Sequence, residues 1–214
     1  MFQKIKVVLL SIKKRGIFET LKIIYNELVY DMVNKVDTGN IIFLDNLEVV
    51  DGGNKKESIE YCPTNRVALE YVFNFLSKNY NLKEFNFIDF GCGKGRVLIE
   101  ATKYGFKNII GIEFTKELFA IASENIAKLN IKNCKLYNVD ATKFNFKNIN
   151  GGGKMIYYFY NPFVGKTFKK VIENIKSSKN SGLIVYVNPI CKDVLKDFKE
   201  IDRFKDEVVI YEIV

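Results

Sequence analysis

Histidine and tryptophan are absent from the 214-residue sequence, and proline occurs only three times. The lack of histidine excludes a catalytic imidazole and removes the usual zinc ligand sets. The four cysteines are far apart and form no C-x-x-C pair, so we expect no metal site and a reduced, cytoplasmic protein. In the N-terminal segment the longest uncharged run, residues 7–12, is far too short to span a bilayer.

Arginine is also scarce among the basic residues. The formal net charge is +8, but only four of the 33 basic residues are arginines. Recognition of bases and phosphates favours the arginine fork, so this charge is a weak indication of nucleic-acid binding. A biased amino-acid composition explains the lysines, and an anionic partner remains as the alternative, whether RNA, a phosphorylated glycan carrier or a membrane surface.

Two segments near the N-terminus have apolar residues at helical spacing, over residues 4–14 and 17–34, with lysines around the first. We expect residues 1–58 to form a helical extension and a connecting segment. The extension would pack on the following domain or on a second copy in a homodimer. A basic helix on an anionic membrane, making the protein peripheral to it, and a lid over the substrate are the alternatives.

Residues 59–214 are expected to form one domain, because no linker divides them and no solenoid repeat occurs. Strands and helices alternate from residue 85, which predicts an α/β fold with a mostly parallel sheet. Thr64 is the expected N-cap of the first helix, and the last strand follows too closely on its predecessor to be parallel to it. The expected helices are 65–78, 95–104, 115–129, 165–178 and 191–197, and the expected strands are 85–90, 108–113, 133–138, 154–160, 182–188, 199–204 and 207–213.

The most informative motif is a glycine-rich turn between a buried strand and a helix. It reads D-x-G-x-G-x-G, with Asp89 at the end of the strand and Gly91, Gly93 and Gly95 in the turn. Ligands of parallel α/β sheets bind at the carboxyl ends of the strands, and glycines allow the backbone to come close to them. The third glycine of a dinucleotide fingerprint would fall on Arg96, and the P-loop pattern does not occur.

The next strands also end in polar residues. Glu113 ends the second strand, where a carboxylate can accept hydrogen bonds from both hydroxyls of a ribose, and Phe114 offers a flat ring for a base. Asp140 follows the third strand. The fourth strand ends in the sequence Tyr160-Asn161-Pro162-Phe163.

The glycine turn, together with "FIDFGCGKGR", "IIGIEF", "YFYNPF" and "VYVNP" in this order, resembles the class I S-adenosylmethionine-dependent methyltransferases. The resemblance covers residues 37–214 and implies a Rossmann-like, seven-stranded sheet with one late antiparallel strand, and S-adenosylmethionine as cofactor. It also implies that Asp89 holds the cofactor's ammonium group and Glu113 its ribose, with Phe114 beside the adenine. The remaining implied cofactor-binding residues are Gly91, Cys92, Gly93 and Gly95 in the turn, Tyr61 and Thr64 over the methionine end, Asp140 and Ala141 at the adenine, and Asn161.

The fourth strand bears on the acceptor. Enzymes that methylate amide or adenine nitrogens carry [DN]-P-P-[YFW] here, and this sequence lacks the second proline. By that resemblance Asn161 and Tyr160 position the acceptor, and Pro162 and Phe163 contact it. Alternatively, Pro162 merely ends the strand and Phe163 packs in the core. The chain is similar to a group of small bacterial methyltransferases of unassigned substrate, and distantly to the non-SET lysine methyltransferases.

We therefore expect methyl transfer by in-line displacement to a nitrogen or oxygen nucleophile. A small molecule or glycan is favoured as acceptor, then protein lysine, then RNA. Two alternatives remain open: a non-catalytic module that binds the cofactor or assembles with a partner, and a nicotinamide-dependent oxidoreductase.

Overall fold

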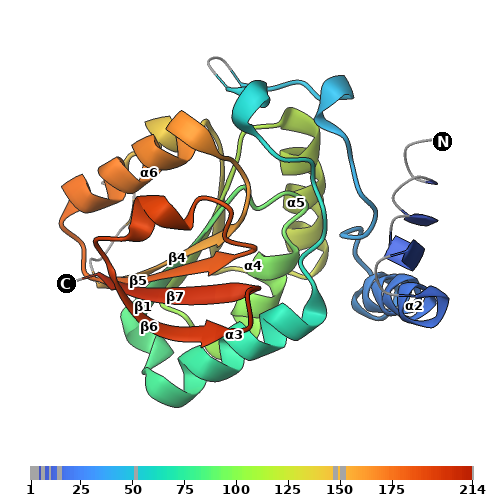
Figure 1. Ribbon diagram of the computed structural model, residues 1–214, viewed down its shortest axis with the longest axis horizontal. Helices are drawn as coiled ribbons and strands as arrows, with labels where there is room; N and C mark the ends of the chain where they lie inside the picture. Colours follow the sequence, from blue (N-terminus) through green and yellow to red (C-terminus); the bar gives the residue numbers. More distant parts are fainter. Residues whose placement is uncertain are drawn as a thin grey trace.

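The computed structural model describes residues 5, 8–9, 11–13, 16–50, 53–146, 149 and 153–213. Its centre is a seven-stranded sheet in the order β3-β2-β1-β4-β5-β7-β6 (Figure 1). The strand bounds lie within two residues of those expected from the sequence. They are β1 Phe85–Phe90, β2 Asn108–Glu113, β3 Cys134–Asn138, β4 Lys154–Tyr160, β5 Gly182–Val187, β6 Lys199–Phe204 and β7 Val208–Ile213.

The predicted topology is confirmed. Strands β1 to β5 pair in parallel, and β7 runs antiparallel to both of its neighbours, β5 and β6. Strand β1 lies in the middle of the sheet, where Asp89 is in register with Gly111 of β2 and Tyr158 of β4. The chain order reverses at β1, so the crevice beyond its carboxyl end is where this class of fold binds ligands.

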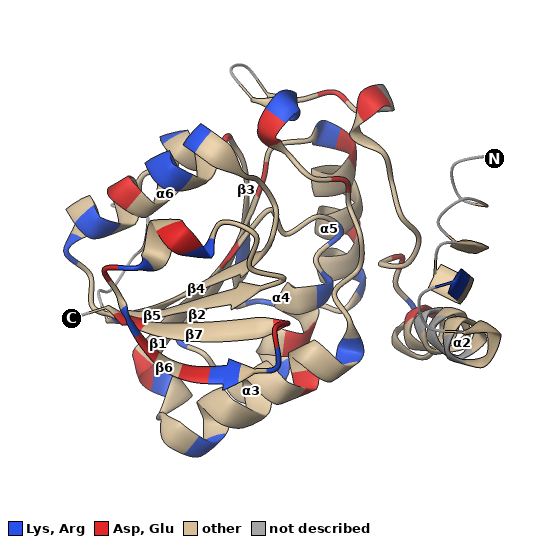
Figure 2. Ribbon diagram, in the orientation of Figure 1, with Lys and Arg blue, Asp and Glu red and all other residues tan. Residues whose placement is uncertain are grey.

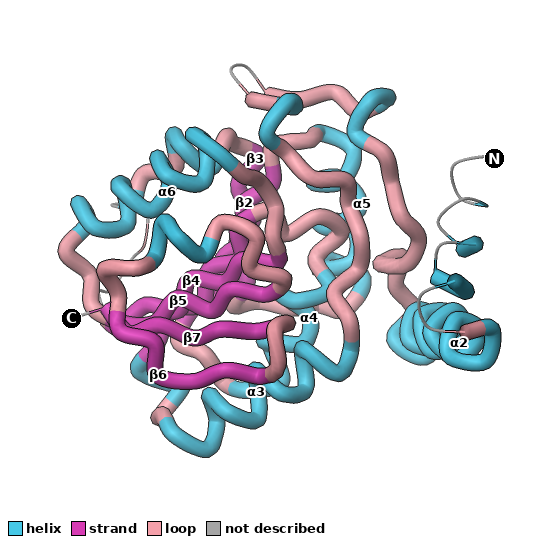
Figure 3. The backbone as a smooth tube through the Cα atoms, viewed as in Figure 1, coloured by secondary structure: helices cyan, strands magenta, loops and turns pink. Residues whose placement is uncertain are grey.

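Helices cover both faces of the sheet (Figure 3). Apolar residues alternate along β1, so that Phe87 packs with α3, α4 and α5 on one face while Ile88 packs with α6 on the other. Both faces of β1 are therefore buried, as expected for a central parallel strand. The helices are α3 Arg66–Asn79, α4 Arg96–Ala101, α5 Lys116–Lys128 and α6 Gly165–Ser178.

Three local predictions are corrected. Thr64 is not the N-cap of α3, because the Asn65 side chain accepts the hydrogen bond from the Val67 N–H. The helix expected over 95–104 ends at Ala101 and continues as a single 3-10 turn. The helix expected over 191–197 is a 3-10 turn over Lys192–Leu195.

The N-terminal extension contains α2, Ile17–Asn34, which lies beside the sheet rather than over it (Figure 1). The helix expected over 4–14 falls partly outside the described residues, and those that are described there are helical. Within the described chain, no helix has the length and apolarity that a membrane crossing requires.

The connecting segment after α2 returns across the carboxyl edge of the sheet. It forms isolated bridges that join Ile42 to Tyr61, Val49 to Thr115 and Ser58 to Phe163. The expected boundary at residue 58 therefore falls within a segment that is hydrogen-bonded to the sheet domain at several points.

Candidate active site

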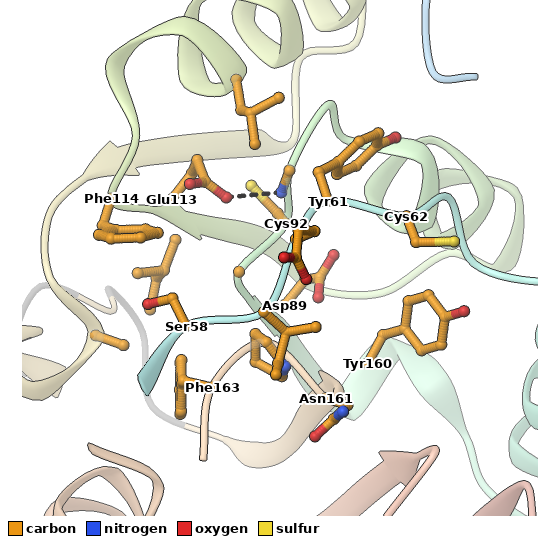
Figure 4. Close-up of a pocket in the computed structure, with 18 of the residues that line it drawn as sticks. Ser58, Tyr61, Cys62, Asp89, Cys92, Glu113, Phe114, Tyr160, Asn161 and Phe163 are labelled. Carbon is orange, nitrogen blue, oxygen red and sulfur yellow. Dashed lines mark hydrogen bonds between the residues drawn. The ribbon is translucent and has the colours of Figure 1, made fainter. Parts of the chain in front are cut away.

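A cavity of about 320 Å³ opens at the carboxyl ends of β1, β2 and β4 (Figure 4). Nearly all of the site residues expected from the sequence line it, although they come from five separate stretches of the chain. These residues are Tyr61, Thr64, Asp89, Gly91, Cys92, Gly93, Glu113, Phe114, Asp140, Ala141, Tyr160, Asn161, Pro162 and Phe163. Gly95 is not part of the cavity wall.

The side chains of Pro162 and Tyr61 lie close to the backbone of the glycine turn. Gly91 and Gly93 have positive φ angles of 74° and 54°. A Cβ on Gly91 would lie 2.4 Å from Pro162, and one on Gly93 would lie 2.3 Å from the ring of Tyr61. These two positions require glycine for both conformation and space. Gly95 instead starts α4 in a left-handed conformation and faces Ala122 of α5.

Glu113 is buried at the end of β2, and the protein already supplies hydrogen bonds to both of its carboxylate oxygens. Its Oε2 accepts from the Gly93 N–H at 2.9 Å, and its Oε1 accepts from the Thr115 N–H and hydroxyl, also at 2.9 Å. Burial raises the pKa of Glu113, while the hydrogen bonds from Thr115 and Gly93 oppose that rise. The side chain thereby joins the glycine turn to the start of α5.

Asp89 is buried at the end of β1, but its environment is different. Its Oδ2 has no hydrogen-bond partner among the described residues. Burial, with a smaller contribution from the charge of Glu113, raises the pKa of Asp89 well above its ordinary value. A buried carboxylate oxygen without a partner is costly, so the Asp89 carboxylate, which borders the cavity, is suited to a cationic group that enters it.

The adenine end expected from the sequence is formed by the loops after β2 and β3. Phe114 lines the cavity, and the connecting segment packs on it through Gly53, whose added Cβ would lie 2.8 Å from the ring. Asp140 lines the cavity and also caps the following turn, since its Oδ1 accepts from the Thr142 N–H and hydroxyl. The capping role and a ligand-binding role are compatible, because a carboxylate accepts several hydrogen bonds.

The end of β4 forms the opposite wall. Asn161 is buried and has a φ of 42°, an uncommon conformation that is further disfavoured before a proline. Its Oδ1 accepts a long hydrogen bond of 3.5 Å from the Tyr186 hydroxyl. The Pro162 carbonyl accepts from the Ile59 N–H, and Phe163 is buried in the core below. Phe163 therefore packs in the core, as the alternative interpretation expected, and it also borders the cavity.

Two buried cations tie the glycine turn to the residues that follow α2. Lys94 Nζ donates to Asp37 at 2.7 Å and to the Gly39 carbonyl at 2.9 Å. Arg96 donates from Nε to the Thr38 hydroxyl, and its guanidinium stacks over the ring of Tyr30. A dinucleotide fingerprint would require glycine at position 96. This chain has Arg96 there, and its guanidinium has a structural function.

Sequence reasoning missed the contribution of the connecting segment. Ser58, Ile59 and Cys62 also line the cavity, because the bridge to Phe163 pulls this segment over the end of β4. Asn188 lines it as well, at the end of β5. Asn188 has a φ of 49° and precedes Pro189. This second Asn-Pro pair at the end of a strand was the sequence signal that could have revealed Asn188 as a site residue.

Comparisons with known proteins agree with this geometry. Residues 81–212 match a family model described as a methyltransferase domain. An uncharacterised protein of Methanocaldococcus jannaschii is 35% identical over 79 residues, a match that spans only 35% of that relative's length and 36% of this chain.

Two solved structures have the same fold. A proposed methyltransferase of Escherichia coli, yhhF, has a TM-score of 0.56 at 20% identity, covering 78% of this chain and 90% of its own. A proposed methyltransferase of Streptococcus mutans, solved in complex with S-adenosylhomocysteine, has a TM-score of 0.53 at 16% identity, covering 70% and 99%.

The match over most of the chain shows that it belongs to the methyltransferase-domain family. It carries a class I S-adenosylmethionine-dependent methyltransferase domain. The residues present fit this cofactor, which bears a sulfonium and an ammonium charge, because three buried carboxylates border the cavity, at Asp89, Glu113 and Asp140, and Oδ2 of Asp89 has no described partner.

Proposed function

We propose that this enzyme methylates a nitrogen or oxygen nucleophile on a small molecule or glycan, with protein lysine and then RNA as less favoured acceptors. The observation that carries the proposal is the charge of the cavity. Its described lining contains four carboxylates and one guanidinium, and that guanidinium, on Arg96, is engaged by Thr38 and Tyr30. An acidic cavity suits a cationic cofactor and opposes the entry of a phosphate-rich acceptor.

Enclosure of the cavity also supports a small acceptor. The connecting segment is hydrogen-bonded to the loop after β4 through Ile59 and to the loop after β2 through Val50. Glu57 fixes the same segment to the start of α6, because its carboxylate accepts from the N–H groups of Lys166 and Thr167. A wall held at three points limits the size of the group that reaches the reaction centre and keeps water out.

In this proposal each carboxylate binds a different part of the cofactor. Asp89 pairs with the ammonium group, and Glu113 uses its remaining acceptor capacity for the ribose. Asp140, with the Ala141 N–H, meets the adenine that Phe114 flanks. Tyr61 and Thr64 close the methionine end, where the Tyr61 hydroxyl is fixed by donation to the Thr38 carbonyl.

When bound, S-adenosylmethionine supplies a methyl group already activated by the positive sulfur. Tyr160 and Asn161 position the acceptor, and Pro162 and Phe163 border it. The side-chain carbonyl of Asn161 can accept a hydrogen bond from an amine or hydroxyl of the methyl acceptor. A neutral amine needs no strong base, which agrees with a sequence that contains no histidine.

The test is a screen for transfer of a labelled methyl group, first to amine- and hydroxyl-bearing small molecules and glycans, then to protein and RNA. Asn161→Gly removes the side chain and tolerates the left-handed backbone. We expect at least a tenfold loss of transfer with a smaller change in affinity for S-adenosylhomocysteine. Asn74→Ala, at an exposed position on α3, is the matched control and should have no effect.

Full transfer by Asn161→Gly would show that Asn161 does not position the acceptor. Transfer only to protein or RNA would overturn the acceptor class while leaving methyl transfer in place. A folded wild type that binds the cofactor but modifies nothing in the screen would favour the non-catalytic module.

A further inference from the structure

Helix α2 has its apolar side turned outward. Large apolar side chains recur along one stripe of the helix, and their exposed fractions range from 38% for Ile24 to 85% for Phe18. This stripe, the outer face of α2, consists of Ile17, Phe18, Leu21, Ile24, Tyr25, Leu28 and Met32. It runs for about 22 Å at the usual rise of a helix. Surface helices of globular proteins normally bury such a stripe.

The opposite side of α2 attaches to the domain mainly through polar contacts. The Tyr30 hydroxyl donates to Glu100 at 2.7 Å, and Asp31 lies 3.7 Å from the guanidinium of Arg96. Asp31 also accepts hydrogen bonds from Thr38 and Gly39. These contacts fix the helix with its apolar stripe facing away from the protein, so the exposure follows from how α2 is held.

The described residues that precede α2 include exposed apolar side chains as well. Ile5, Val8 and Leu9 are themselves 37% to 60% exposed, although Ser11 bonds to Thr20 at the start of α2. These three residues add to the exposed apolar surface of the described N-terminal region. Figure 2 shows α2 on the side of the molecule away from α6.

The charge of the sequence that precedes α2 favours an anionic partner for this face. Residues 1–16 contain five basic residues and no acidic one, namely Lys4, Lys6, Lys13, Lys14 and Arg15. A second copy of the chain carries the same excess of positive charge, since the formal net charge is +8. An anionic surface would instead provide the opposite charge, and a lipid surface also accepts the apolar side chains.

We propose that the outer face of α2 docks this enzyme on an anionic lipid membrane without crossing it. Ile17, Leu21, Leu28 and their neighbours enter the boundary between headgroups and acyl chains, and the positive charge of residues 1–16 attracts the protein to anionic headgroups. The docked helix is joined through Asp31 and Thr38 to Arg96 of the cofactor turn, so docking holds the active site at the membrane surface. This inference is independent of the acceptor proposed above.

The test is flotation of the full-length protein with vesicles of phosphatidylcholine, with and without about one third phosphatidylglycerol. We expect flotation only with the anionic vesicles and its weakening at high salt. Leu28→Glu should reduce vesicle binding at least tenfold. Val67→Glu is the matched control, since Val67 on α3 is 55% exposed against 60% for Leu28, and it should bind as the wild type does.

A second variant tests the charge. Lys13 is exposed, and Lys13→Glu should weaken binding to anionic vesicles without changing the thermal unfolding of the protein. Equal binding to neutral and anionic vesicles would overturn the choice of an anionic surface. Failure of the wild type to bind any vesicle, or vesicle binding that Leu28→Glu does not change, would overturn the docking role. A dimer in light scattering that Leu28→Glu converts to a monomer would assign the face to a second copy.

Discussion

The two carboxylates at the ends of β1 and β2 differ in how the protein satisfies them. Both are buried, and both have a raised pKa. Glu113 accepts three hydrogen bonds from Gly93 and Thr115, whereas Oδ2 of Asp89 accepts none from the described residues. Donors of the protein therefore satisfy the carboxylate of Glu113, whereas the carboxylate of Asp89 is left partly unsatisfied, and we expect it to pair with a ligand.

We therefore expect a structural role for Glu113 and a ligand-binding role for Asp89, although the sequence shows both only as acids at strand ends. Removal of Glu113 should damage the framework, because buried donors lose their acceptor. Removal of the Asp89 charge should spare the framework and affect the ligand. Three substitutions, at Glu113, Gly93 and Asp89, test this difference between the two acids.

The largest effect on stability is expected for Glu113→Ala. It leaves the N–H groups of Gly93 and Thr115 and the Thr115 hydroxyl without their acceptor. At ~1–3 kcal/mol for each unsatisfied buried group, we expect a loss of roughly 3–5 kcal/mol in the free energy of unfolding, measured in urea.

Glu117→Ala is the matched control for that experiment. Glu117 also accepts a backbone N–H, from Glu48, but in an exposed setting, so its removal should cost less than about 1 kcal/mol. Equal losses for the two variants would show that the bonds of Glu113 do not support the framework.

A smaller effect is expected for Gly93→Ala, which disturbs the turn that donates to Glu113. The new Cβ would meet the Tyr61 ring, and φ would remain positive. Gly105→Ala separates the two causes, since Gly105 has a φ of 74° but no atom within 4 Å of an added Cβ. We expect Gly105→Ala to cost about 1 kcal/mol from the backbone alone and Gly93→Ala clearly more. Thermal unfolding would measure both, and equal costs would mean that Tyr61 moves aside freely.

The sheet and the positions of the site residues could be predicted because both depend on local patterns. Apolar runs such as residues 85–90 end in turn residues, and parallel strands bring their carboxyl ends to one edge. Asp89, Glu113 and Asn161 each end a strand of this kind. Their meeting at one cavity therefore follows from the topology once the strands are assigned.

The contacts that cross from the N-terminal region to the sheet domain could not be predicted. The bridge between Ser58 and Phe163 joins residues 105 positions apart in a segment without periodicity. The burial of Lys94 and Arg96 depends on Asp37 and Thr38, and an isolated lysine or arginine is normally expected in solvent. The N-cap at Asn65 was missed because Thr64 and Asn65 are both good capping residues and only the geometry selects one.

The smallest expected effect on stability, and the most direct effect on function, belongs to Asp89→Asn. Because burial raises the pKa of Asp89 in the folded protein, its contribution to stability is greatest below the unfolded value near ~4 and is lost as the pH rises through the folded value. At neutral pH the neutral amide should therefore leave the cofactor-free protein at least as stable as the wild type. Binding of an ammonium group requires the ionised acid, so affinity in the wild type should fall as the pH is lowered.

Calorimetric titration with S-adenosylhomocysteine, comparing the wild type with Asp89→Asn at neutral and mildly acidic pH, would show whether Asp89 binds the cofactor. At neutral pH we expect the variant to bind roughly 10- to 100-fold more weakly, which corresponds to the ~1.5–3 kcal/mol of a charge-assisted hydrogen bond, and to lose most of the wild type's pH dependence. Equal affinities and equal pH profiles in two folded proteins would contradict the account, because Asp89 would then not be the acid reserved for the cofactor.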